Sequence, residues 1–172
     1  MRKKSNSRIK RLKKTNEFLI QKFKKEAREA KIAYLLSLFD KESINYEVIF
    51  DDYNDLTTDT PRNWIQHHYT FQSWGKINSK LLKNSRVFNY DDYNSYTEVL
   101  NKIIQQAHIE PKFVYIVWGS QPLLKMQLLD VVEYAFYIFG EYWCTWIACP
   151  EEAWCIEHNN MGDISFLPVE KN

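Results

Sequence analysis

Hydrophobic positions near the start of the chain recur with helical spacing. Between residues 9 and 39 the apolar side chains follow one another at steps of three, four or seven: Leu12, Leu19, Phe23, Ala27, Ala30, Tyr34 and Leu38. Lysine and arginine occupy the opposite face. This pattern predicts one long amphipathic helix whose basic residues are concentrated near its start. We expect the polar residues 1–8 before it to fray.

After this helix, short apolar runs alternate with helical patterns. Runs rich in β-branched and aromatic side chains predict strands at residues 46–50, 86–90 and 113–118. Helical spacing predicts helices at residues 64–83, 95–108 and 124–139. Pro61 suits a first helical position, and Ser95 and Glu98 have the spacing of a capping box. Three further short runs predict strands at residues 142–149, 153–158 and 164–167.

The order of these elements predicts an α/β protein. Helices and strands alternate along most of the chain, whereas strand follows strand at its end. We expect one domain over residues 1–172, with a mixed sheet, packed helices, the long N-terminal helix and a C-terminal antiparallel meander. A length of 172 residues suits a single core, and four glycines and five prolines leave little material for long linkers.

The tetrapeptide Asp-Asp-Tyr-Asn occurs twice, at residues 51–54 and 91–94, each time after a predicted strand. In one interpretation these residues end strands, form turns and cap the next helix. In the other they form an acidic, aromatic surface for a basic partner, gathered at one end of the sheet if the two strands run parallel. The candidate partner-binding residues are Asp51, Asp52, Tyr53, Asp55, Asp59, Asp91, Asp92 and Tyr93. Because they lie in loops, we expect them to be exposed, so that replacing them changes stability by less than about 0.5 kcal/mol.

The net charge of +1 conceals a strong asymmetry. Residues 1–32 carry 13 basic and three acidic side chains, a net charge of +10, whereas residues 33–172 carry 10 basic and 19 acidic side chains, a net charge of −9. The acidic body favours a basic partner. The basic arm either contacts nucleic-acid phosphates or is a solvated helix end that offsets the acidic body. We favour the second interpretation because no known nucleic-acid-binding motif surrounds the arm.

The sequence offers no convincing catalytic or metal site. Calcium loops need ligands at alternate positions and a glycine at the sixth, which neither register starting at Asp51 or Asp52 provides. The cysteines Cys144, Cys149 and Cys155 lack zinc-site spacing and are expected to be small buried residues. Glu157 and His158 are neighbours on a strand and therefore point to opposite faces. We expect no cofactor, no small-molecule substrate and no enzymatic activity; a small hydrolase is the remaining alternative.

The chain also lacks the patterns of membrane proteins. No run reaches the roughly 18 apolar residues that a membrane span needs. The charged N-terminus has no apolar core followed by a cleavage site, as a signal peptide would. We therefore expect no membrane partner, a cytoplasmic location and reduced cysteines.

The last third of the chain resembles a known group of proteins. The strand ending in Val-Trp-Gly-Ser-Gln-Pro, the paired tryptophans Trp146 and Trp154, and Ile156-Glu157-His158 followed by Gly162-Asp163-Ile164 resemble bacterial toxin immunity proteins of the contact-dependent growth inhibition type. The resemblance covers residues 113–166, and the basic N-terminal helix has no counterpart in it. It implies a non-catalytic cytosolic inhibitor that binds a cognate toxin domain, often a basic nuclease. Contacts in that group are specific to each pair, so no binding residue is carried over.

Overall fold

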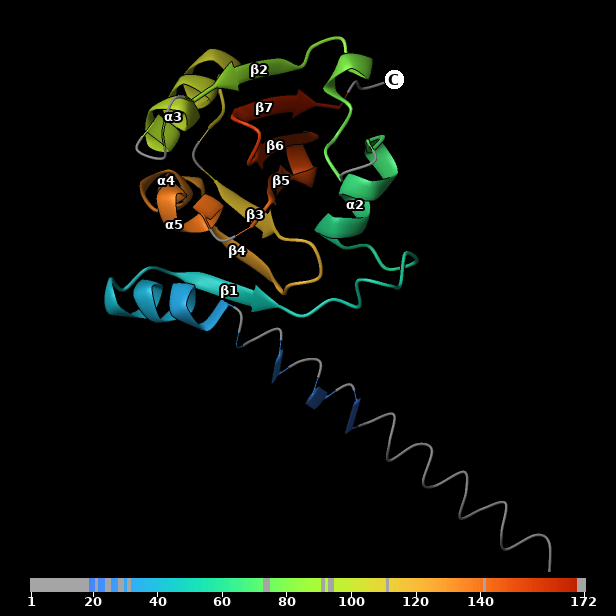
Figure 1. The fold of residues 1–172 in the computed structure, drawn as a ribbon, viewed down its shortest axis with the longest axis vertical. Helices are drawn as coiled ribbons and strands as arrows, with labels where there is room; N and C mark the ends of the chain where they lie inside the picture. The colour runs from blue at the N-terminus through green and yellow to red at the C-terminus, as the bar shows by residue number, and fades with distance from the viewer. Residues whose placement is uncertain are drawn as a thin grey trace, which may run out of the picture.

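A seven-stranded antiparallel sheet forms the centre of the protein (Figure 1). The computed structural model describes residues 19–20, 22–23, 26–27, 30, 32–72, 75–90, 92, 95–110, 112–140 and 142–169. The strand order is β1-β4-β3-β5-β6-β7-β2. The strands are β1 (Tyr46–Ile49), β2 (Arg86–Asn89), β3 (Phe113–Val117), β4 (Leu123–Gln127), β5 (Cys144–Cys149), β6 (Trp154–Asn159) and β7 (Asp163–Pro168). The α/β class is confirmed, but every hydrogen-bonded strand pair is antiparallel, so the prediction of a mixed sheet is wrong.

The C-terminal meander has the predicted form. β5, β6 and β7 pair in sequence order, with Ile147 opposite Ile156 and Ile156 opposite Phe166. Two tight connections join the strands, and each contains a residue in the left-handed region: Ala153 (φ 60°) and Gly162 (φ 98°). β3 lies inside the sheet between β4 and β5, as its continuous apolar run predicts.

Helices cover both faces of the sheet. The helical residues 32–41 pack on one face together with α3 (Tyr96–Ala107), α4 (Leu128–Glu133) and α5 (Ala135–Gly140). The opposite face carries α2 (Pro61–His68) (Figure 1). A smaller hydrophobic core forms between α2 and the sheet. The larger core contains residues of β3, β5 and β6 that alternate with those of the smaller core, as expected for a sheet buried on both sides.

The long N-terminal helix lies largely outside the described residues, as do residues 1–8. In the part that is described, the buried face differs from the predicted one. Ile32, Leu35 and Phe39 are buried, whereas Tyr34 is 65% exposed. Both sets have helical spacing, so spacing alone did not identify the face that meets the sheet.

Two predicted helices are partly wrong. The helix predicted at residues 124–139 begins as strand β4, whose backbone pairs with β1 on one side and with β3 on the other. A short apolar run suits a buried strand as well as a buried helix. The helix predicted at residues 64–83 ends at His68, and a short hairpin follows in which Phe71 pairs with Ile77.

β1 and β2 form the two opposite edges of the sheet. If the sheet were flat, its two edge strands β1 and β2 would point the same way, because they are first and seventh in an alternating antiparallel order. Neighbouring strands are usually rotated by about 20–25°, which adds up to a rotation of roughly 120–150° between the two edges. The arrowheads of β1 and β2 accordingly point in opposite directions in Figure 1. β1 and β2 are not neighbouring strands: they lie at opposite edges, about 29 Å apart along the sheet, so Asp51 and Asp92, which follow them, do not form one cluster.

Candidate binding site

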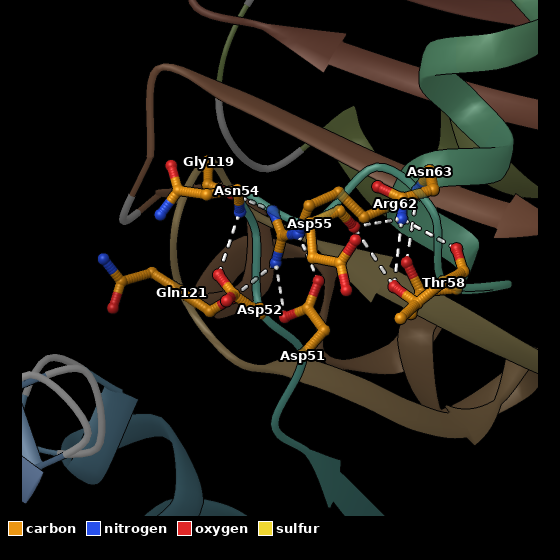
Figure 2. Close-up of polar contacts among 10 residues, drawn as sticks. Asp51, Asp52, Asn54, Asp55, Thr58, Arg62, Asn63, Gly119 and Gln121 are labelled. Carbon is orange, nitrogen blue, oxygen red and sulfur yellow. Dashed lines mark hydrogen bonds and ion pairs between the residues drawn. The ribbon is translucent and has the colours of Figure 1, made fainter. Parts of the chain in front are cut away.

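Asp51, the first residue of the first acidic loop, is buried rather than exposed. Its side chain is 1% exposed and forms an ion pair with Arg62, whose side chain is 5% exposed, with Nε 2.5 Å from Asp51 Oδ2. Figure 2 shows the guanidinium of Arg62 between this carboxylate and the backbone of Gly119 and Gln121. The expectation that Asp51 is a surface residue is therefore wrong. It neutralises a buried cation that ties the loop and α2 to the β3–β4 connection.

Arg62 reaches this position because α2 begins directly before it. Thr60 is the N-cap, its hydroxyl accepts a hydrogen bond from the Asn63 amide, and Pro61 fills the first turn as predicted. The side-chain amide of Asn63 donates to the carbonyl oxygens of Asp55 (2.8 Å) and Thr58 (2.7 Å), so it holds the acidic loop against α2 (Figure 2).

The remaining carboxylates of the first loop face solvent to different degrees. Asp52 is exposed and accepts a hydrogen bond from the Asn54 amide. Asp55 is half-buried and accepts hydrogen bonds from the hydroxyl and amide of Thr57, which lower the pKa of its carboxyl group. Asp59 is exposed. Turn formation thus explains Asp52 and Asp55, and it leaves their outer oxygens available to a partner.

The second acidic loop is described only at Asp92, since Asp91 and Tyr93 lie outside the described residues. Asp92 is exposed and accepts a hydrogen bond from the Ser95 amide, while the Ser95 hydroxyl donates to the Asp92 carbonyl oxygen. The predicted capping box is wrong, because Ser95 makes no side-chain bond to α3. Asp92 therefore fixes the turn that leads into α3 rather than capping the helix.

A pocket of about 530 Å³ opens beside the first loop, which we call the Tyr53 pocket. It is lined by Tyr53, Arg62, Ile65, Gln66, Phe71, Gly75, Val117, Gly119 and Trp146. Three aromatic rings and two aliphatic side chains give it mostly apolar walls, with Arg62 and Gln66 as its polar side chains. A concave apolar site with a few converging polar groups is the usual form of a binding site.

One wall of the pocket is fixed to the sheet by a buried carboxyl group. Glu157 Oε1 accepts hydrogen bonds from the Ile77 amide (2.8 Å) and from Trp146 Nε1 (2.9 Å). Phe71 pairs with Ile77, and its ring meets that of Trp146 edge to face at a centroid distance of 5.9 Å. Glu157 therefore holds two of the three aromatic rings in place.

Burial gives Glu157 an unusual pKa. Loss of solvent raises the pKa to about 7, even though the hydrogen bonds from Ile77 and Trp146 and the charge of Lys76 act in the opposite direction. Lys76 in turn forms an ion pair of 2.7 Å with Asp163.

His158 points to the other face of the sheet, so the prediction that it cannot share a site with Glu157 is confirmed. Its ring stacks on Phe139 at a centroid distance of 4.5 Å, and Nε2 lies 3.2 Å from the hydroxyl groups of Tyr90 and Tyr96. Burial lowers the pKa of His158 to about 4. It is a neutral core residue at physiological pH.

The cysteines provide no activated nucleophile. All three are free; Cys149 and Cys155 are buried as predicted, and Cys144 is intermediate. Burial raises the pKa of Cys144 and of Cys149 to about 11 and also raises that of Cys155, so the thiols stay protonated. Within the described ranges, no group of histidine, cysteine and acidic side chains could hold a metal ion, and no helix is long and apolar enough to cross a membrane.

The sequence points to Tyr53 and, through the resemblance, to Trp146, but not to the other residues of the pocket. Phe71 falls within the predicted helix at residues 64–83, and Arg62 and Gln66 belong to a short helix with no recognisable motif. Comparisons with known proteins add no family to this geometry: no protein-family model, curated protein or solved structure matches the chain.

Proposed function

We propose that this protein is a non-catalytic, cytoplasmic immunity protein that binds and neutralises a cognate bacterial toxin domain, a basic nuclease being the best fit. The observation that carries the proposal is the pairing of an apolar, aromatic pocket with the exposed carboxylates of Asp52 and Asp59 on the same loop as Tyr53. Aromatic anchors surrounded by complementary charge are typical of tight protein–protein contacts.

The charge distribution supports the same partner. A nuclease domain is basic because it must hold phosphates. The net charge of −9 over residues 33–172 would attract such a domain and accelerate its association. The contact surface that we propose contains fewer residues than the set predicted from the sequence. It is centred on the first loop and excludes Asp51, whose carboxylate forms an ion pair with Arg62.

A protection experiment tests this function. An immunity protein should be encoded directly after a large toxin gene, so the probe is the C-terminal domain of the protein encoded directly upstream. Expression of that domain alone should stop growth, and co-expression of the present protein should restore it. Growth that stays arrested at equal expression levels would argue against the proposal.

The exposed loop carboxylates should act on the rate of association. We expect Asp52→Asn/Asp59→Asn to slow association with the toxin domain by about 3–10-fold at low salt and to have little effect at high salt, because exposed charges act by screened steering. Stability should change by less than about 0.5 kcal/mol. The measurement is stopped-flow binding at several salt concentrations. Glu98→Gln/Glu110→Gln removes the same charge from exposed sites beyond the loop; equal slowing by that control would assign the effect to net charge alone.

The alternative function, nucleic-acid association through the basic arm, rests on the net charge of +10 over residues 1–32. We expect only weak, sequence-independent binding that falls steeply with salt as counterions are released. Deletion of residues 1–8 should leave the melting temperature of the body unchanged. Gel-shift titrations at physiological salt provide the check, and tight sequence-selective binding there would favour the alternative.

A further inference from the structure

The Tyr53 pocket contains a buried hydrogen-bond donor that the protein itself does not use fully. Arg62 carries five N–H groups. Nε donates to Asp51 Oδ2, Nη2 donates to Asp51 Oδ1 and to the Gln121 carbonyl oxygen, and Nη1 donates to the Gly119 carbonyl oxygen. Among the described residues, one Nη1–H is left without an acceptor. Arg62 lines the pocket although the residue is only 4% exposed.

This arrangement selects the chemistry of an occupant. The positive charge of Arg62 is already balanced by Asp51, so the pocket does not require an anion. An occupant that excludes water from the second Nη1–H must supply an acceptor for it, because leaving a buried donor unsatisfied is costly. Gln66, on the exposed side of α2, adds an amide group that can accept or donate.

The apolar walls of the pocket favour an occupant with a flat ring. Ile65 and Val117 are buried aliphatic side chains, and the rings of Tyr53, Phe71 and Trp146 line the remaining walls. Flat aromatic rings bury a large area and pair well with other rings in edge or offset contacts. The hydrogen bonds from Ile77 and Trp146 to Glu157 fix two walls in advance, which lowers the entropic cost of binding.

We propose that the Tyr53 pocket receives a tyrosine side chain of the toxin domain, with its ring between the aromatic walls and its hydroxyl oxygen accepting from Arg62. The hydroxyl hydrogen can donate to the Gln66 amide oxygen, so both roles of a phenol are met. A phenylalanine would leave the Arg62 donor unpaired, and an arginine would bring a second guanidinium beside it. Asp52 and Asp59 on the loop carrying Tyr53 favour a basic protein as the source of this side chain. That the tyrosine belongs to a toxin domain rests on the proposed function.

Small aromatic probes test the pocket without any toxin. The indole N–H signal of Trp146, assigned by comparison with Trp146→Phe, reports binding in nuclear magnetic resonance titrations of the full chain. We expect p-cresol, which is the side chain of tyrosine, to bind at least ten-fold more tightly than toluene. Gln66→Ala should weaken p-cresol binding and leave toluene binding unchanged, whereas His67→Ala, an exposed neighbour on α2, should change neither. Equal binding of toluene, or binding of adenine or guanidinium ten-fold tighter than p-cresol, would overturn the proposal.

A second arm separates the pocket from the proposed function. With the upstream-encoded toxin domain, Tyr53→Ala should weaken binding at least ten-fold and Gln66→Ala by a smaller factor, with melting curves close to the parent. If both variants bind the domain as the parent does, the pocket assignment falls and the immunity function stands. If p-cresol binds as expected but the domain is not bound, the proposed function falls and the tyrosine assignment falls with it.

Discussion

Asp51→Ala is expected to lower the free energy of unfolding by about 3–5 kcal/mol, because it leaves the guanidinium of Arg62 buried without its counter-charge. The carbonyl oxygens of Gly119 and Gln121 remain, but dipoles do not replace a carboxylate. Chemical denaturation at neutral pH measures the effect. Asp52→Ala is the matched control, since it removes the neighbouring carboxylate from an exposed site, and it should cost less than about 1 kcal/mol.

A double variant separates charge from packing. Asp51→Leu/Arg62→Met removes both charges, and replacing a buried ion pair by apolar residues of similar size is often neutral. We expect it to be more stable than Asp51→Ala by about 2 kcal/mol or more. If Asp51→Ala is instead as mild as Asp52→Ala, the ion pair is not the element that fixes the loop to the sheet.

The pH dependence of stability should expose two neighbouring residues with opposite behaviour. The pKa of Glu157 is raised from 4.5 to about 7. Its stabilising contribution to the free energy of unfolding is therefore complete below pH 4.5 and is lost as the pH rises to 7. The pKa of His158 is lowered from 6.5 to about 4. Its stabilising contribution to the free energy of unfolding is therefore complete above pH 6.5 and is lost as the pH falls to 4. Each difference corresponds to about 3 kcal/mol. Between pH 4.5 and 6.5 one contribution falls about as much as the other rises, so their pH dependences nearly cancel and stability changes little.

Glu157→Gln should remove this cancellation. Glutamine keeps an acceptor for the Ile77 amide and for Trp146 Nε1 but cannot ionise. Relative to the parent, the variant should gain about 3 kcal/mol in unfolding free energy as the pH rises from 4.5 to about 7.5. His158→Gln should show the opposite trend: relative to the parent, its free energy of unfolding should rise as the pH falls from 6.5 to 4. Denaturant titrations across this range give the measurement, with Glu98→Gln as an exposed control. A pH-independent difference for Glu157→Gln would show that Glu157 titrates normally.

Patterns that depend on neighbours in sequence predicted much of this fold. Strand alternation placed Glu157 and His158 on opposite faces, and the apolar run of β3 placed it inside the sheet. The C-terminal meander followed from short strands separated by turn residues. Each of these features is set within a few residues, which is the range over which a sequence pattern carries information.

Features that depend on distant contacts were missed. Asp51 looked like a surface residue because its partner, Arg62, lies on the next helix and their common site is completed by Gly119 and Gln121. The helix predicted over residues 64–83 ends at His68, and the residues after it bond to distant strands: Tyr69 donates a hydrogen bond to the Leu167 carbonyl oxygen and Ile77 donates one to Glu157. The Tyr53 pocket combines residues of five segments, which no spacing rule connects. Whether the two acidic loops cluster depends on the strand order, which places β1 and β2 at opposite edges and which no local pattern predicts.

The proposed immunity function is tested most directly by calorimetric titration of the full chain with the purified C-terminal domain of the protein encoded directly upstream, followed by an activity assay of the mixture. We predict a one-to-one complex with a dissociation constant below about 100 nM and loss of the toxin's activity at one equivalent. A failure to bind, or a complex in which the toxin domain keeps its activity, would contradict the account.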